Sequence, residues 1–178
     1  MARTIFIYGL VAGVLTLTLV GVGAGILGFD HGVEGMVWGY VSMVVGLSVM
    51  FVGVRRYAEA HGPLTFVQAF LPAFGIFVFA GLIYVVGWEA YLAATHYTFA
   101  EEFASQTVAA KVAEGATAAE LVKLEADMAH FKLQYANPLF RLPMTFLEIA
   151  PIGLILSLLA GFAMRTPRGD DHAFDDED

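Results

Sequence analysis

The chain has 178 residues, of which 58% are hydrophobic, and it carries a mean hydropathy of +0.72 and a formal net charge of −8. This composition is far more apolar than that of an ordinary soluble domain and indicates a membrane protein. The absence of cysteine excludes disulfides and thiolate chemistry, and the lack of any Lys/Arg cluster larger than Arg55–Arg56 excludes a basic nucleic-acid-binding surface.

Four long apolar runs predict four transmembrane helices, because a helix needs about 20 mostly apolar residues to cross a bilayer. The first run is longer than the apolar part of a cleavable signal peptide, which has about 7 to 15 residues, so we expect it to be retained. The sequence predicts an all-α fold, a four-helix transmembrane bundle with helices at about 5–27, 36–54, 66–87 and 143–164.

Positive charges near the helix ends predict the orientation, because Lys and Arg in short loops are retained in the cytoplasm. If the helices alternate in direction, five arginines fall on one side of the membrane: Arg3, Arg55, Arg56, Arg165 and Arg168. The opposite side has a short loop without Lys or Arg and one long segment, and long segments count little in this rule. Both termini are therefore predicted to be cytoplasmic.

The segment between the third and fourth helices predicts an extramembrane helical hairpin over about 98–136. Thr98 with Glu101, and Thr117 with Glu120, have the spacing of a capping box, in which two side chains bond free amides at a helix start. A stripe of apolar residues follows at steps of three and four: Leu121, Leu124, Met128, Phe131 and Tyr135. We expect the hairpin to cap the ends of the bundle, with a partner-binding groove as the alternative.

Small residues recur along the predicted membrane helices, where they let backbones approach closely. The second helix has one every seven residues, at Gly32, Gly39, Gly46 and Gly53. Packing within one bundle is the favoured use of such residues, and a homodimer seam is the alternative. We assign 1–165 to the membrane domain with its hairpin, and 166–178 to an acidic disordered tail.

Charged residues in or beside the apolar runs are candidates for a polar site, because an unpaired charge at the bilayer centre costs at least about 2.5 kcal/mol. They are Glu89, at the end of the third helix, and Glu148, about five residues inside the fourth. In a structural interpretation Glu148 pairs with Arg141, two turns earlier, or caps backbone groups near Pro151. In a functional interpretation Glu89, Glu148 and His96 form a proton or cation site. The structural one is favoured, since both acids are expected near the interface.

A second group of polar residues, Asp30, His31 and Glu34, offers oxygen and nitrogen ligands within five residues, as a divalent metal ion would require. A Gly-rich loop with a few polar residues is also the ordinary connection between two membrane helices. No nucleophile, P-loop or dinucleotide-binding motif occurs, so we expect no catalytic residue, no cofactor and no enzymatic activity.

Six segments from the second helix onward carry a family resemblance. They are GYVSM at 39–43, FVGV at 51–54, GPLTF at 62–66, YVVGWE at 84–89, YANP at 135–138 and TFLEIAPIG at 145–153. In this order and spacing they resemble a bacterial membrane family known as domain-of-unknown-function family 4199. The resemblance implies four helices in a bacterial inner membrane and supplies no mechanism. Its segments include Trp88, Glu89, Glu148 and Pro151, and Arg141 lies between the last two of them.

The sequence therefore favours a non-enzymatic assembly, accessory or scaffolding component of the bacterial envelope. The alternative is a small proton- or ion-coupled transporter or channel subunit that uses Glu89 and Glu148. The expected surroundings are membrane lipid, with a homodimer or another membrane protein as the possible partner.

Overall fold

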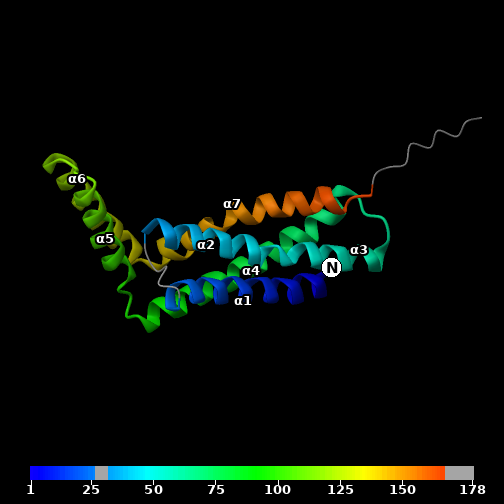
Figure 1. Ribbon diagram of the computed structural model, residues 1–178. Helices are drawn as coiled ribbons and strands as arrows, with labels where there is room; N and C mark the ends of the chain where they lie inside the picture. The colour runs from blue at the N-terminus through cyan, green and yellow to red at the C-terminus, as the bar shows by residue number, and fades with distance from the viewer. Residues whose placement is uncertain (27–31, 167–178) are drawn as a thin grey trace, which may run out of the picture.

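The computed structural model describes residues 1–26 and 32–166, which form helices joined by short turns (Figure 1). The helices are α1 (Ala2–Gly25), α2 (Gly32–Leu47), α3 (Val49–His61), α4 (Phe66–Ala94), α5 (Phe99–Ala113), α6 (Ala118–Tyr135) and α7 (Pro138–Met164). Within the described residues, α1, the α2–α3 pair, α4 and α7 are each long and apolar enough to cross a membrane. The all-α class and the four membrane-length helices are thus confirmed.

The second predicted helix is divided at Ser48 into α2 and α3. The Ser48 hydroxyl donates to the carbonyl of Val44 at 2.6 Å, and the amide of Phe51 donates to the Ser48 carbonyl at 3.1 Å. A serine that bonds back to the preceding turn commonly bends a helix without ending it. The two helices together form one span, Glu34–His61, which is longer than the predicted 36–54.

The last membrane helix begins five residues earlier than predicted, at Pro138 instead of residue 143. The Asn137 side chain accepts a hydrogen bond from the amide of Leu139 at 3.0 Å, and proline at the first helical position needs no amide partner. Asn137 and Pro138 therefore end α6 and also start α7. Pro143, the predicted start, lies inside α7.

Helix α4 is the centre of the bundle, and α1 and α7 pack along its length (Figure 1). A methyl group added to Gly9 or Gly13 of α1 would come within 2.8 Å of Phe79 or Ile83 of α4, so these two helices run parallel. Helix α7 runs antiparallel to α4. The fully buried side chains between the helices include Met43, Leu47, Met50, Ile76 and Ile149.

Small residues do bring the helices together, as the sequence predicted. A methyl group on Gly46 would come within 2.9 Å of the Thr16 backbone nitrogen in α1, and one on Gly53 within 2.8 Å of Ile76 in α4. Gly39, on the same seven-residue repeat, has no atom within 4 Å of such a methyl group. Packing inside the bundle thus explains the glycines at positions 46 and 53 of the repeat, but it does not explain Gly39.

Helices α5 and α6 pack against each other through aromatic side chains. The rings of Phe103 and Phe131 are 5.6 Å apart, and those of Phe99 and Tyr135 are 5.7 Å apart. Gly115, in the turn between the helices, has φ of +82°, a conformation that glycine adopts at little cost. The predicted stripe on α6 faces this contact, because its members are half-buried or buried and the flanking Val122 is 67% exposed.

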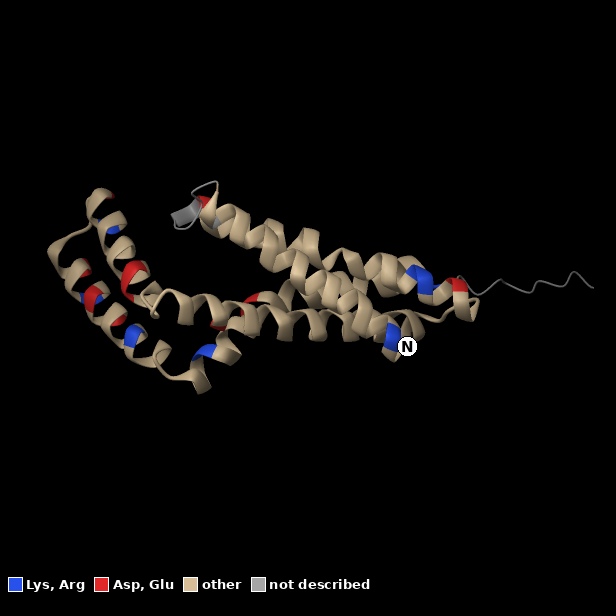
Figure 2. Cartoon of the chain, turned by 90° about the horizontal axis from the view of Figure 1, so that it is seen from below, with Lys and Arg blue, Asp and Glu red and all other residues tan. Residues whose placement is uncertain are grey.

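The α5–α6 pair does not lie over the ends of the bundle, so the predicted cap is wrong. The pair extends away from the end opposite the N-terminus (Figures 1 and 2). It contacts the bundle through α7 and through Trp88 of α4, which packs on Phe99 and bonds Tyr135. The cause is the direct passage from Tyr135 through Asn137 into α7, which makes α7 begin where α6 ends.

Of the two predicted capping boxes, one is present and the other is wrong. Thr117 and Glu120 bond each other's amides at the start of α6. Thr98, at the start of α5, has helical φ and ψ and makes no side-chain capping bond. Its expected partner Glu101 bonds the Nζ of Lys132 at 2.9 Å instead. The predicted tail lies outside the described residues apart from Thr166, whose amide donates to the Leu64 carbonyl at 2.9 Å.

Candidate functional site

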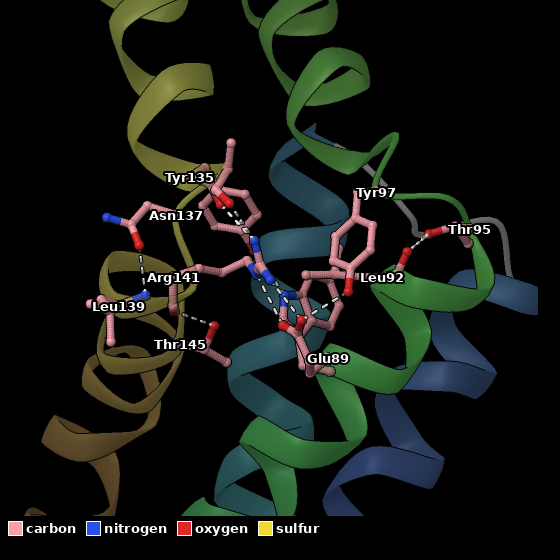
Figure 3. A network of polar contacts seen from close by, with 11 residues as sticks. Glu89, Leu92, Thr95, Tyr97, Tyr135, Asn137, Leu139, Arg141 and Thr145 are labelled. Atoms are coloured by element: carbon pink, nitrogen blue, oxygen red, sulfur yellow. Dashed lines mark hydrogen bonds and ion pairs between the residues drawn. The ribbon is translucent and has the colours of Figure 1, made fainter.

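The most connected polar cluster lies where α4, α6 and α7 meet (Figure 3). Glu89 of α4 and Arg141 of α7 form a two-pronged ion pair: Nε donates to Oε2 at 2.9 Å, and Nη2 donates to Oε1 at 2.6 Å. Parallel bonds between a guanidinium and a carboxylate are strong and fix their mutual orientation. This pair joins two helices whose residues are 52 positions apart in the chain.

The third guanidinium nitrogen of Arg141 holds the end of α6. Nη1 donates to the carbonyls of Tyr135 at 2.8 Å and Ala136 at 3.4 Å, which are among the acceptors that a helix end leaves without a partner. The Arg141 side chain is only 4% exposed, and that of Glu89 is 30% exposed. One buried arginine therefore connects the central helix to the junction of α6 and α7.

Two tyrosines and a tryptophan complete this cluster. The Tyr97 hydroxyl donates to Glu89 Oε1 at 3.0 Å, which raises the pKa of Tyr97 because the phenol proton is held by a carboxylate. The guanidinium carbon of Arg141 lies 4.9 Å from the ring centre of Tyr97 and 5.8 Å from that of Tyr135. Trp88 Nε1 donates to the Tyr135 hydroxyl at 2.9 Å.

The turn that brings Tyr97 to Glu89 has an unusual backbone. His96 and Tyr97 have φ of +54° and +59°, a left-handed conformation that costs a residue with a side chain roughly 1 to 2 kcal/mol. The amide of Tyr97 donates to the Leu92 carbonyl at 2.7 Å, and its hydroxyl bonds Glu89. These contacts hold the strained turn against the end of α4.

The chemistry open to this cluster is limited, because all three nitrogens of Arg141 donate to acceptors and both Glu89 oxygens accept. A carboxylate held in this way by a guanidinium is a poor proton carrier, since protonation would break two charge-assisted bonds. The cluster is therefore suited to fix α6 relative to the bundle. This geometry fits the interpretation that the charged residues have a structural role, with Glu89 and not Glu148 as the partner of Arg141.

Glu148 lies elsewhere, and its predicted pairing with Arg141 is wrong. Side chains on a helix lean toward its N-terminus, so Arg141 reaches back to Tyr135 and not forward to a residue about 10 Å along the axis. Glu148 is exposed on α7, and within the described residues it forms no ion pair or hydrogen bond. It is also ten residues into the helix instead of five, because α7 begins at Pro138.

The remaining predicted site residues are not brought together. His96 is exposed, and its neighbour Tyr97 takes the place at Glu89 that the sequence interpretation gave to the histidine. Of the proposed metal ligands, Glu34 is exposed in the first turn of α2, and Asp30 and His31 lie outside the described residues. Within residues 1–26 and 32–166, no three His, Asp or Glu side chains are grouped to hold a metal ion.

Sequence reasoning missed both tyrosines. The sequence pattern indicates Tyr135 only as a member of the apolar stripe, although its ring and carbonyl both contact Arg141. Tyr97 lies eight residues after Glu89, about two helical turns, and this spacing is the feature of the sequence that could have indicated a contact between them. The strained turn after α4 then reverses the chain, which no helical periodicity can foresee.

These features define a class: an all-α protein with four membrane-length helices and an additional helical pair, whose end is held by a buried arginine that also forms an ion pair within the bundle. The chain belongs to the family described as Protein of unknown function (DUF4199), whose model matches residues 6–166. This confirms the family resemblance of the sequence segments. No similarity to a curated protein or to a solved structure was found.

Proposed function

We propose that the chain is a non-enzymatic, multi-pass protein of the bacterial inner membrane that acts as an assembly, accessory or scaffolding component. Its termini lie in the cytoplasm, and the α5–α6 pair forms a rigid hairpin outside the membrane. The single observation that carries this proposal is the exposed position of Glu148 on α7. A membrane partner that covers this carboxylate gives the chain its role.

The depth of Glu148 follows from the packing of α7 on α4. A methyl group on Gly81 would touch Phe146 and Ile149, so Glu148 is level with Gly81. Gly81 is next to the middle residue of α4, a helix of 29 residues that is about 44 Å long. A hydrocarbon layer of about 30 Å, placed anywhere along this helix, includes its middle. Glu148 therefore lies at the depth of the lipid tails.

A carboxylate that faces lipid tails is costly and calls for a partner group. Glu148 lies beside the exposed apolar residues Leu147, Met144 and Ile155 of α7, so the surface around it suits a second apolar helix. The partner that matches it is a transmembrane helix with a cation or a hydrogen-bond donor at mid-membrane depth. A second copy of this chain is one possible source of such a helix.

Site-specific crosslinking in native membranes tests this proposal. Because the sequence has no cysteine, Leu147→Cys places one thiol beside Glu148. We expect a crosslinked adduct of one defined mass, lost when Glu148→Ala is added. Val14→Cys, at another exposed position on α1, is the matched control and should give no adduct. An adduct that does not depend on Glu148, or crosslinking to lipid only, would contradict the proposal.

The second candidate function is a small proton- or ion-coupled transporter or channel subunit. Glu148 also favours it, because a titratable group at mid-membrane depth is a common element of proton pathways. Glu89, its proposed companion, is held by Arg141 instead. If the purified chain alone in vesicles carries a pH-dependent flux that Glu148→Gln abolishes without unfolding the protein, transport is the function and the accessory role is wrong.

A further inference from the structure

A cavity of about 420 Å³ lies at the base of the α5–α6 pair, next to the Arg141 cluster. Its walls include the charged residues Glu101, Lys132 and Arg141 and the rings of Tyr97 and Tyr135. Leu92, Ala100, Ala136 and Pro138 supply an apolar part. The cavity therefore combines two cations and one carboxylate with a surface that accepts hydrocarbon.

The cavity lies at the depth of the lipid headgroups. Ile5, the first large apolar residue after Arg3, touches Gly75 of α4, and α1 and α4 are parallel. A helix crosses the hydrocarbon layer in about 20 residues. If the layer begins at the level of Gly75, it therefore ends near Thr95. If the layer instead begins at Phe66, the first residue of α4, it ends near residue 86. The cavity residue Leu92 falls between these limits, and Trp88 and Tyr91 beside it are typical of the interface.

The charges around the cavity occur in pairs. Arg141 is fully engaged by Glu89 and by the end of α6. The Lys132 ammonium bonds Glu101 at 2.9 Å, with 36% of the lysine side chain and 73% of the glutamate side chain exposed. An exposed ion pair of this kind contributes little to stability, so a ligand that offers the opposite charges can replace it at small cost. Because the Lys132–Glu101 pair has no net charge, it also gives the cavity no preference for a ligand with a net negative charge.

We propose that this cavity binds the headgroup of an ethanolamine phospholipid. The lipid phosphate accepts hydrogen bonds from Lys132, and its primary ammonium group donates to Glu101. Choline fits less well, because it has no N–H to donate and because the tyrosine faces that attract quaternary ammonium groups are already next to Arg141. The acyl chains leave along the apolar side formed by Leu92 and Pro138.

Native mass spectrometry of the full chain, released from nanodiscs with equal amounts of ethanolamine, choline and glycerol phospholipids of identical acyl chains, tests the assignment. We expect ethanolamine lipid to be retained about tenfold over each other class, as one additional charge-assisted hydrogen bond would give. The double variant Glu101→Lys with Lys132→Glu keeps an ion pair but reverses its direction, and it should retain all three classes equally.

The matched control is the same exchange at the far end of the hairpin, Lys111→Glu with Glu114→Lys, because that pair is also exposed and lies at the C-terminal end of α5. It should retain ethanolamine lipid as the unaltered chain does. Glu101→Gln alone, which changes no packing, should lose the preference for ethanolamine over choline and covers the case in which the double variant does not fold.

Three results would overturn the inference: equal retention of all lipids by the unaltered chain, unchanged preference in the reversed pair, or loss of preference in the Lys111 and Glu114 control. Soluble phosphoethanolamine distinguishes the source of the headgroup. We expect no displacement of lipid at equal concentration, and displacement would identify a soluble zwitterion as the ligand and remove the lipid from the assignment. None of these outcomes depends on whether Glu148 contacts a partner.

Discussion

The four-span bundle and the α5–α6 pair are held together in different ways. Contacts in the bundle are made by glycines that let α1, α3 and α7 approach their neighbours, and charged side chains are few along its length (Figure 2). Between α5 and α6 the contacts are aromatic rings and an ion pair, and a capping box starts α6. The difference matches their expected surroundings, because lipid does not drive apolar surfaces together and close backbone packing must replace that force.

Arg141 joins the two regions, because it pairs with Glu89 of α4 and donates to the carbonyl of Tyr135 at the end of α6, so removing it should have the largest effect. We expect Arg141→Met to lower the free energy of unfolding by about 3 kcal/mol, because it leaves a carboxylate without its partner in a mostly buried site. Thermal unfolding in mild detergent, followed by circular dichroism, measures the change.

Glu148→Gln is the control for that experiment, since Glu148 is exposed and lacks a partner within the described residues. It should not lower the unfolding midpoint, because it removes no ion pair or hydrogen bond among the described residues. Adding Glu89→Gln to Arg141→Met should recover part of the lost stability, because the orphaned charge disappears. If Arg141→Met were as stable as the unaltered chain, the ion pair would not join the two regions.

Two glycine substitutions on the same helix test whether close backbone packing stabilises the bundle. Gly46→Ala should destabilise the protein by about 1 to 3 kcal/mol, because its methyl group meets the Thr16 backbone. Gly39→Ala, one repeat earlier on the same helix, meets no atom within 4 Å and should be neutral or slightly stabilising. The unfolding midpoints of the two variants give the comparison, and equal losses would refute close packing as the reason for the repeat.

The sequence predicted the bundle better than the junction, and the reason is physical. Apolar runs and small residues report on the membrane helices directly, since each run must be about 20 residues long. The pairing of Glu89 with Arg141 spans 52 positions and depends on where α7 begins. The spacing of two helical turns indicated Glu148 as a partner of Arg141 if the helix starts early, and local spacing cannot reveal a partner on another helix.

The two capping boxes show a similar limit. Thr98 and Thr117 have the same spacing to a glutamate, yet only Thr117 has the extended backbone of a cap. Thr98 follows the strained turn at His96 and Tyr97, which ties it to the end of α4. The spacing of threonine and glutamate identifies a candidate capping box. The backbone conformation set by the preceding residues determines whether the box forms.

This contrast gives a smaller, local prediction within the α5–α6 pair. Thr117→Ala should cost about 1 kcal/mol, because the start of α6 loses a side-chain acceptor for its amide. Thr98→Ala should cost much less, since Thr98 makes no capping bond. Hydrogen exchange of the amides in the first turn of each helix measures both. Equal loss of protection at the two sites would mean that the box at Thr117 does not stabilise α6.

The smallest expected effect is a pH dependence of the same cap. Hydrogen bonds from the amide and hydroxyl of Thr117 lower the pKa of Glu120, because they stabilise its charged form. A carboxyl whose pKa is lowered on folding contributes stability above its unfolded pKa of about 4.3, and this is lost as the pH falls through the lower folded value. Protection factors at the start of α6 should therefore fall as the pH is reduced below about 4.

The start of α4 provides the control within the same molecule. There Thr65 and Gln68 also form a capping box, with the Thr65 amide 2.9 Å from the Gln68 side-chain oxygen. A glutamine does not titrate, so protection at the start of α4 should stay constant over the same pH range. Glu120→Gln should make the start of α6 behave like the start of α4. If both starts lost protection together, the change would reflect general unfolding in acid, and the cap would have no titration of its own.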